Sequence, residues 1–140
     1  MKIYLILLIS LALIAISAAQ KKSECQEHRE KASKSTSPVK VVPICESNGD
    51  YAALQCHNEG KFCSCWRKDG TPITQPSTKI KSCVCHRDRD DKLKNSKGAP
   101  VPECSDDGKF KKKQCSGSSG QCWCVDPETG IKNKRNANNC

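Results

Sequence analysis

The stretch Gln114-Cys115-Ser-Gly-Ser-Ser-Gly-Gln-Cys122-Trp123-Cys124-Val125 places six Ser, Gly and Gln residues between two cysteines. Gly tolerates positive φ angles and Ser hydroxyls accept hydrogen bonds from turn amides, so this composition favours a tight reversal of the chain. If the flanking residues pair as a hairpin, Cys115 and Cys122 face each other closely enough for a disulfide bond. In the strand that follows, Cys122 and Cys124 share one face and Trp123 takes the other.

A second version of this stretch lies upstream, at Gln55–Trp66, and the whole chain repeats one six-cysteine unit. The cysteines are Cys25, Cys45, Cys56, Cys63, Cys65 and Cys83, followed by Cys85, Cys104, Cys115, Cys122, Cys124 and Cys140. The offsets between the two sets are 60, 59, 59, 59, 59 and 57 residues, and Pro43–Tyr51 aligns with Pro102–Phe110. Chance does not align cysteines, Pro, Gly and an aromatic residue together, so we interpret the chain as two copies of one domain.

The first 19 residues predict a secretory signal peptide. Lys2 precedes an apolar run, Ile3–Ile16, and Ser17-Ala-Ala19 supplies the small residues of a cleavage site. The run is short for a membrane anchor, because a helix that spans a bilayer needs about 20 apolar residues. We expect cleavage after Ala19 and a secreted, extracellular chain with no membrane span.

The composition predicts a small disulfide-rich fold, because twelve cysteines accompany few large apolar side chains. Each unit is expected to hold a short N-terminal helix, a small antiparallel β-hairpin and three disulfides. The helices are predicted at Cys25–Ser33 and at the more heavily charged Cys85–Leu93. The strands are predicted at Val39–Val42, Val101, Tyr51–Cys56 and Phe110–Cys115.

The formal net charge is +9, with a cluster of basic residues towards the C-terminus. The cluster consists of Lys109, Lys111, Lys112, Lys113, Lys132, Lys134 and Arg135. Such a cluster attracts heparan chains, acidic proteins or anionic membranes, although a solvated cationic surface is the simpler interpretation. The secretion signal argues against nucleic acid as a partner.

No combination of residues points to catalysis, a cofactor or a metal ion. His28, His57 and His86 each lie in a charged or polar stretch without a nucleophile, and the even number of cysteines in a secreted chain favours disulfide bonds over free thiolates. The Cys-x-Cys pairs are closer in sequence than the Cys-x2–4-Cys pairs of structural zinc sites. We therefore expect a binding protein and not an enzyme.

The order Pro-x-Cys, Gly-x-Tyr/Phe, Gln-Cys, Cys-Trp-Cys-Val, Gly, Cys resembles the thyroglobulin type-1 domain, twice over, across residues 25–140. The layout is also similar to the two-domain thyroglobulin type-1 proteins of spider venom, of the ctenitoxin kind. Shared features are Cys25-x-x-His-Arg-Glu30, Leu54-Gln-Cys56 and the irregular Cys-x-Cys-aromatic at 63–66. The resemblance implies domains at 22–83 and 84–140. Because only Val84 separates Cys83 from Cys85, the orientation of the two domains should be restricted.

Six cysteines allow fifteen pairings, and sequence alone does not choose among them. The resemblance implies sequential bonds: Cys25–Cys45, Cys56–Cys63, Cys65–Cys83, Cys85–Cys104, Cys115–Cys122 and Cys124–Cys140. The first domain departs from the family where Ser64 replaces the Trp between two cysteines and Trp66 stands where Val is usual. Both positions lie on one strand face, so we expect Trp66 to refill part of the space; otherwise the first domain is less well packed.

Inhibitory members of the family are implied to block papain-like cysteine proteases with a wedge of three loops that enters the active-site cleft. The candidate wedge residues of the first domain are Lys34, Ser35, Thr36, Ser37, Pro38, His57, Asn58, Glu59, Gly60, Lys61, Asp69 and Gly70. Those of the second domain are Ser96, Lys97, Gly98, Ala99, Pro100, Ser116, Gly117, Ser118, Ser119, Gly120, Gln121, Asp126, Pro127 and Glu128.

The resemblance thus implies a monomeric, reversible inhibitor of a papain-like cysteine protease, with an aspartic protease as an alternative target for one domain. Many domains of the family are spacers that inhibit nothing. Two other functions stay open: a venom toxin that acts on a membrane receptor or ion channel, and a glycan-binding module that uses the basic cluster.

Overall fold

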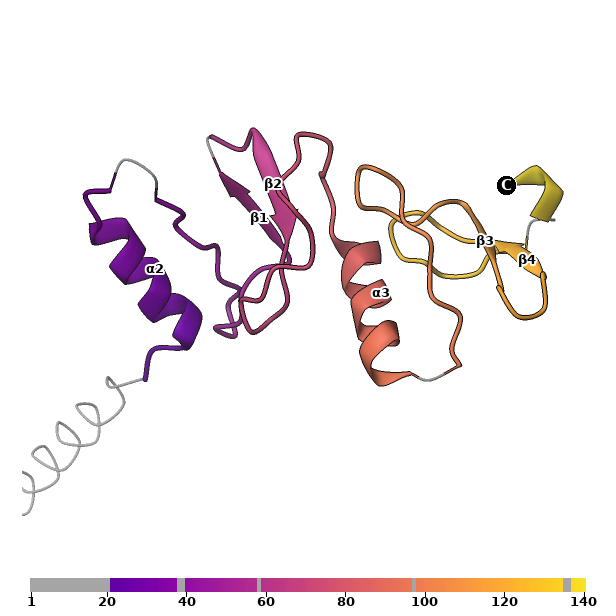
Figure 1. Ribbon diagram of the computed structural model, residues 1–140, viewed down its shortest axis with the longest axis horizontal. Helices are drawn as coiled ribbons and strands as arrows, with labels where there is room; N and C mark the ends of the chain where they lie inside the picture. The colour runs from indigo at the N-terminus through magenta and orange to yellow at the C-terminus, as the bar shows by residue number, and fades with distance from the viewer. Residues whose placement is uncertain (1–20, 38–39, 58, 97, 135–136) are drawn as a thin grey trace, which may run out of the picture.

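The computed structural model describes residues 21–37, 40–57, 59–96, 98–134 and 137–140, so the predicted signal peptide lies outside the described residues. The elements are α2 (Glu24–Lys34), β1 (Leu54–His57), β2 (Phe62–Cys65), α3 (Val84–Asn95), β3 (Lys113–Cys115), β4 (Cys122–Cys124) and the 3-10 helix η1 (Ala137–Asn139) (Figure 1). Each half of the molecule has one α-helix followed by one two-stranded antiparallel sheet. The predicted small disulfide-rich tandem fold is confirmed.

The two helices begin differently. α2 starts with a capping box, in which the Gln26 N–H donates to Ser23 Oγ (3.3 Å) and the Ser23 N–H donates to Gln26 Oε1 (3.0 Å). α3 starts directly after the disulfide-bonded Cys83, which makes no side-chain cap hydrogen bond. Both helices extend one or two residues beyond the predicted ends.

Both hairpins are closed by a disulfide. Cys56 lies opposite Cys63 and Cys115 lies opposite Cys122, and the Cα atoms of each pair are 4.0 Å apart. The other four bonds are Cys25–Cys45, Cys65–Cys83, Cys85–Cys104 and Cys124–Cys140, which is the sequential order that the resemblance implies. All twelve cysteines are therefore paired, and their sulfurs make up much of each small core.

The predicted strands at Val39–Val42 and Val101 are wrong: the described residues there, 40–42 and 101, have no strand structure. The strands predicted from Tyr51 and Phe110 also begin later, because each aromatic residue forms only an isolated bridge with the cysteine six residues before it. The remaining ladders, β1 with β2 and β3 with β4, are four and three residue pairs long.

A buried glutamine takes the place of the missing strand partner. Gln55 is fully buried; its Oε1 accepts from the Ile44 N–H (2.8 Å) and its Nε2 donates to the carbonyls of Ile44 and Ala52 (2.8 and 2.9 Å). Gln114 makes the same three bonds at the matching positions of the second domain, each 2.8 Å long. The glutamine satisfies backbone groups that a neighbouring strand would otherwise bind. The Gln-Cys motif is therefore structural.

Ser64 and Trp66 are a compensating pair. The Trp66 Nε1–H donates to Ser64 Oγ (2.9 Å), and the serine is 2% exposed. The indole ring lies beside Tyr51 and His57, with ring centroids 5.9 and 6.5 Å away. Ser64 stands where the family has Trp, and Trp66 lies two residues later on the same strand face.

The two domains contact each other through the first turns of α3. Arg87 donates from Nη2 to the Tyr51 carbonyl and from Nε to the Trp66 carbonyl, both at 2.7 Å. Arg67 makes a bidentate ion pair with Asp90 (2.6 and 2.7 Å). These charge-assisted bonds join residues on either side of the domain boundary, so they restrict how the domains move relative to each other.

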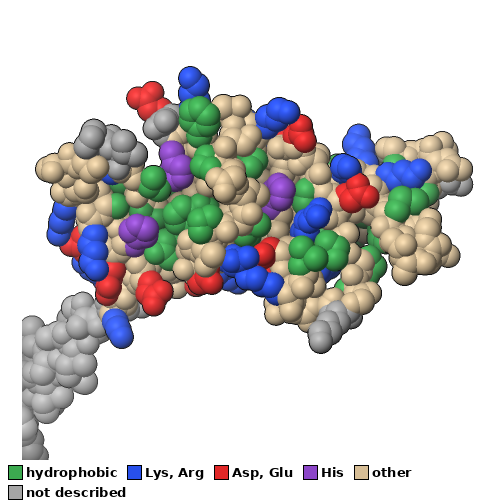
Figure 2. Space-filling view, in the orientation of Figure 1, with side chains coloured by type: hydrophobic (Ala, Val, Ile, Leu, Met, Phe, Trp, Pro, Cys, Tyr) green, Lys and Arg blue, Asp and Glu red, His purple; other side chains and the backbone are tan. Residues whose placement is uncertain are grey.

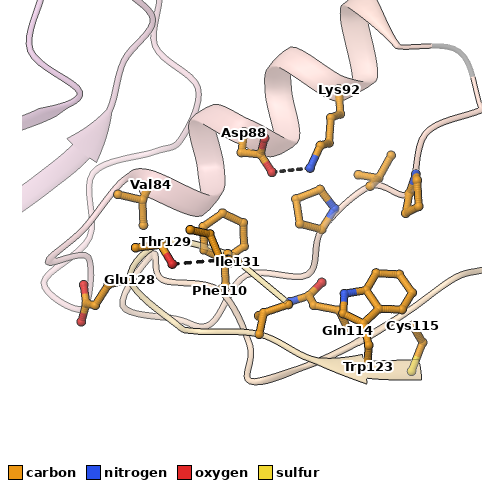
Figure 3. A pocket seen from close by; sticks show the side chains of 15 residues that line it. Val84, Asp88, Lys92, Phe110, Gln114, Cys115, Trp123, Glu128, Thr129 and Ile131 are labelled. Carbon is orange, nitrogen blue, oxygen red and sulfur yellow. Dashed lines mark hydrogen bonds and ion pairs between the residues drawn. The ribbon is translucent and has the colours of Figure 1, made fainter. Parts of the chain in front are cut away.

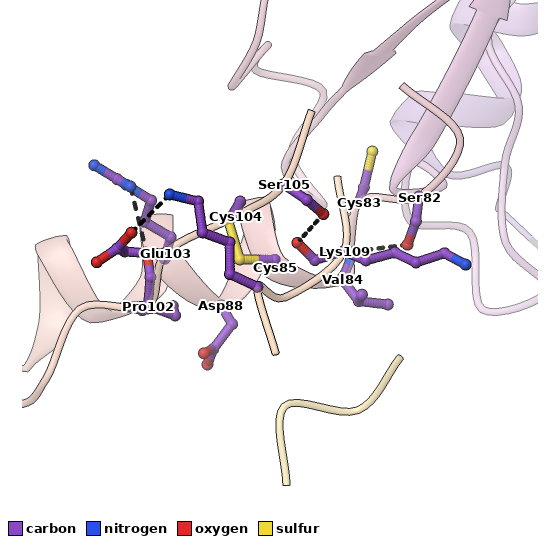
Figure 4. The surroundings of a disulfide bond; sticks show 12 residues. Ser82, Cys83, Val84, Cys85, Asp88, Pro102, Glu103, Cys104, Ser105 and Lys109 are labelled. Carbon is purple, nitrogen blue, oxygen red and sulfur yellow. Dashed lines mark hydrogen bonds and ion pairs between the residues drawn. A yellow bond between two sulfur atoms is a disulfide. The ribbon is translucent and has the colours of Figure 1, made fainter. Parts of the chain in front are cut away.

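Beside this contact, the Cys85–Cys104 disulfide lies next to the chain segment that links the domains, as Figure 4 shows. The backbone N–H groups of Lys81 and Ser82 both donate to the Asp107 carbonyl (2.9 Å). Gly108 has φ +90°, and a Cβ atom at this position would lie 1.8 Å from the Ser82 carbonyl oxygen. Only glycine fits this approach between the second domain and the end of the first.

Candidate functional site

In the first domain, the residues that follow α2 and the hairpin tip both lie towards the same edge in Figure 1. Figure 1 shows the chain beyond the C-terminal end of α2 and the turn between β1 and β2 along the upper edge of the molecule. Glu59, Gly60 and Lys61 are exposed at the tip, and Phe62 is 36% exposed beside them. Glu59 and Gly60 have positive φ angles of 57° and 82°, which reverse the chain. Pro38 and Asn58 lie outside the described residues.

The third predicted loop of the first domain, with Asp69 and Gly70, lies at the opposite end. Lys68 and Asp69 line a hollow with Ser23 and Glu24, at the N-terminal end of α2. α2 has 11 residues and is about 16 Å long, so this turn is far from Lys34. The turn also follows β2, and about 20 Å of extended chain separates it from Phe62. These residues therefore do not share an edge with the other two loops.

A different segment reaches the hairpin tip. Cys63 and Ser77 exchange two backbone hydrogen bonds (3.0 and 2.8 Å), one residue from the start of β2. The segment 74–78 therefore runs beside the strand that leads from the tip. The position of segment 74–78 was not predicted from the sequence, because the segment contains no recognisable motif. The only hint in the sequence is that the chain after the 68–70 turn must return along β2.

The second domain repeats the arrangement. Ser96 and Gly98 follow the C-terminal end of α3, and the hairpin tip Ser116–Gln121 lies at the same lower edge of Figure 1. The tip is closed by its own bonds: the Ser116 N–H donates to the Gln121 carbonyl (2.8 Å) and the Gly120 N–H donates to the Ser116 carbonyl (2.9 Å). Lys97 lies outside the described residues.

The predicted third loop of this domain, Asp126–Glu128, is again remote from the tip. Phe110 N–H donates to the Pro127 carbonyl (3.0 Å), and Glu128 pairs with Lys109 (2.5 Å) on the Asp107–Gly108 side. Hydrogen bonds from the Thr129 backbone and side chain lower the pKa of Asp126 and hold this turn together. The turn therefore has a structural role, because it holds Phe110 and Lys109 in place.

A hollow of about 490 Å³ opens between α3 and the hairpin of the second domain (Figure 3). Its apolar lining includes Val84, Phe110, Trp123 and Ile131, and the Asp88–Lys92 ion pair (2.7 Å) forms part of its wall. At matching positions of the first domain, His28 Nδ1 lies 3.0 Å from the Tyr51 hydroxyl and Trp66 packs beside the same ring. In the first domain, therefore, aromatic side chains occupy the region that corresponds to the hollow of the second domain.

Comparison with known proteins identifies the family of this chain. The family model of the thyroglobulin type-1 repeat matches residues 19–85 and again 84–139. The chain belongs to the thyroglobulin type-1 repeat family. Among its relatives, U20-hexatoxin-Hi1a of Hadronyche infensa is 43% identical over 131 residues, covering 91% of this chain and 90% of that protein. U24-ctenitoxin-Pn1a of Phoneutria nigriventer is 40% identical, covering 77% and 85% respectively.

Thyroglobulin of Rattus norvegicus is 31% identical over 119 residues, which cover 79% of this chain but 4% of thyroglobulin. The shared part is thus the thyroglobulin type-1 module itself. The names of these three relatives are those of toxins and of thyroglobulin and not of enzymes. A disulfide-rich chain of this family fits an extracellular location.

In the thyroglobulin type-1 fold of this chain, part of the basic cluster is already paired. Lys109 contacts Glu128 (2.5 Å), Lys111 contacts Glu103 (2.8 Å), and Lys132 Nζ lies 5.7 Å from the centroid of the Trp123 ring. On the face in Figure 2, basic and acidic side chains are interspersed along the molecule. Arg135 lies outside the described residues. The described part of this face therefore offers a glycan no uniform basic surface.

Within the described residues, no group of three or more His, Cys, Asp and Glu side chains is arranged to hold a metal ion. His86 is partly buried, and burial followed by the charge of Arg89 lowers its pKa. No helix in the described part of the chain is long and apolar enough to cross a membrane.

Proposed function

We propose that the chain is a secreted, reversible inhibitor of papain-like cysteine proteases. Each domain is proposed to insert one edge into the active-site cleft, so that substrate is excluded without any bond being made or broken. The observation that carries the proposal is common to both domains: the hairpin tip is closed by a disulfide bond, and in Figure 1 the segment that follows the helix lies towards the same edge of the domain.

Pre-organisation favours this use of the edge. The Cys56–Cys63 and Cys115–Cys122 bonds hold each tip in one conformation before any partner binds. A pre-ordered loop loses little conformational entropy on docking, so its buried contacts contribute directly to affinity. In the first domain, segment 74–78 takes the place of the 68–70 turn as the third part of the proposed wedge.

The comparisons support the general class. Domains of the thyroglobulin type-1 family include protease inhibitors, and two relatives of nearly the same length have toxin names. We infer from these names that the chain is a venom component. The same names support a second candidate, a toxin that acts on a membrane receptor or ion channel.

The test is inhibition of papain and of cathepsins L, B and S by the oxidised chain, with pepsin as the aspartic protease. Lys61→Glu and Gly117→Glu place a carboxylate at the two tips; Gly117 has no positive φ, and a Cβ there would meet nothing within 4 Å. A carboxylate buried in a cleft without a partner is costly. We expect the double variant to raise the inhibition constant at least 100-fold.

The control is Lys68→Glu, an equal charge reversal at the opposite end of the first domain, which should change the inhibition constant less than twofold. Full activity of every cysteine protease at micromolar wild-type chain would refute the proposal. An effect on ion currents in that case would support the toxin candidate.

A further inference from the structure

We propose that one chain holds two protease molecules at once, on opposite sides of the molecule. This inference rests on the proposed function and adds to it the stoichiometry and the geometry of the complex. Its basis is the direction in which the two proposed edges face once the domains are joined.

The two domains point in roughly opposite directions. In Figure 1, α2 runs from its N-terminal end at the bottom to its C-terminal end at the top, whereas α3 runs from top to bottom. Because the first part of each proposed wedge follows a helix C-terminus, the edge of the first domain faces upwards and that of the second faces downwards. The hairpin tips follow the same rule: the β1–β2 turn lies at the top and Ser116–Gln121 lies at the bottom.

The junction keeps this arrangement in place. Arg87 binds the carbonyls of Tyr51 and Trp66, and Asp90 binds Arg67; the Arg67 and Asp90 side chains are 26% and 13% exposed. Such partly buried, bidentate contacts are much stronger than exposed ion pairs. The single residue between Cys83 and Cys85 leaves no linker that would allow the domains to swing.

The junction also leaves both hairpin tips free. It uses the start of α3, the 105–108 turn and the residues around Arg67, and the 68–69 turn lines the same junction together with Asp90 and Lys94. Of segment 74–78, Thr74 and Ser77 line a hollow with His86 and Cys104 of the second domain. The described residues of the hairpin tips and of the segments after the helices take no part in these contacts. A protease bound at one edge therefore lies on the far side of the molecule from a protease bound at the other.

The two edges differ in chemistry. The first tip has Glu59, Lys61 and the half-exposed Phe62, whereas the second tip has only Ser, Gly and Gln. We therefore expect the two sites to bind the same class of protease with different affinities. The first site offers charge and apolar contact, and the second offers backbone and hydroxyl hydrogen bonds.

The experiment is titration of the oxidised chain with papain, read by native mass spectrometry and by light scattering after size exclusion. We expect a complex of two papain molecules to one chain for the wild type, and one to one for Lys61→Glu or Gly117→Glu alone. Ser118→Glu is a second variant of the second tip. Intact disulfide mass and unchanged circular dichroism establish that each variant is folded.

Small-angle scattering tests the opposite placement. A protease of about 200 residues is roughly 40 Å across, so two on opposite sides give a complex of at least roughly 80 Å. Inhibition with one papain per chain at saturation, or two papain molecules in mutual contact, would overturn this inference and leave the proposed function standing. Absence of any inhibition would overturn both.

Discussion

At the scale of single residues, the buried glutamines show how a side chain can make the backbone hydrogen bonds that a neighbouring strand would otherwise make. Gln114 is 4% exposed and binds the backbone of Glu103 twice and that of Lys111 once. Its chemistry is thus as necessary to the domain as that of the neighbouring Cys115. A hydrophobic side chain of similar size would fill the space and leave the Glu103 N–H and the Lys111 carbonyl without this partner, whereas the Glu103 carbonyl would still accept from the Lys111 N–H.

We predict that Gln114→Leu lowers the free energy of unfolding by about 3 kcal/mol, because each buried polar group left unsatisfied costs about 1–3 kcal/mol. Denaturant unfolding followed by tryptophan fluorescence measures the change. The matched control is Gln121→Leu, at an exposed position of the same hairpin, which should change stability by less than about 0.5 kcal/mol. Equal stability of the two variants would contradict the structural role given to Gln114.

At the scale of elements, each hairpin depends on its disulfide more than on its ladder. β3 and β4 share only three residue pairs, and an isolated ladder of that length is marginal in water. The Cys115–Cys122 bond closes the tip across a sequence separation of 7. The tip is thus ordered by covalent connection.

Replacing Cys115 and Cys122 together by Ser should cost about 2–3 kcal/mol in the loop-entropy model. The loss should be local, so hydrogen exchange at the Ser116 and Gly120 amides is expected to accelerate while that of α3 stays unchanged. Papain should then bind only at the first domain. Unchanged exchange at the tip would show that its own hydrogen bonds suffice to order it.

At the scale of the whole molecule, the junction makes the arrangement of the domains sensitive to acid. The hydrogen bond from Arg67 is the main cause that lowers the pKa of Asp90 below 3.8, although burial opposes it. A carboxyl whose pKa is lowered on folding contributes stability above its unfolded pKa, and loses it as the pH falls through the folded value. The contribution of this pair should therefore be complete at pH 5 and above.

We predict that Asp90→Asn reduces stability at pH 6 and that its difference from the wild type shrinks below pH 3. Small-angle scattering at pH 6 should also show a wider distribution of domain orientations for the variant. Asp106→Asn is the control, because the side chains of Asp106 and Lys79 are 80% and 69% exposed and exposed pairs contribute little. A pH-independent difference for Asp90→Asn would rule out the ion pair as its cause.

Much of the domain could be predicted because its signals are local. The Ser and Gly residues between Cys115 and Cys122 predict the hairpin, and the cysteine offsets predict the duplication. The strand predictions at Val39–Val42 and Val101 failed because apolar composition does not reveal whether a partner strand lies beside the segment. The resemblance to inhibitory family members assigned the Asp69 and Asp126 turns to the wedge, whereas their packing against Tyr51 and Phe110 places them at the other end of each domain.

The sequence by itself determined the repeat, the disulfide-rich class and the two hairpins, since cysteine content, turn residues and strand alternation can be read from the chain without knowing distant contacts. Only the tertiary structure decided which loops share an edge and which way the two edges face. Those features depend on contacts such as that of Arg87 with Tyr51, 36 residues apart. No local pattern encodes such a contact, because it depends on how the folded domains pack.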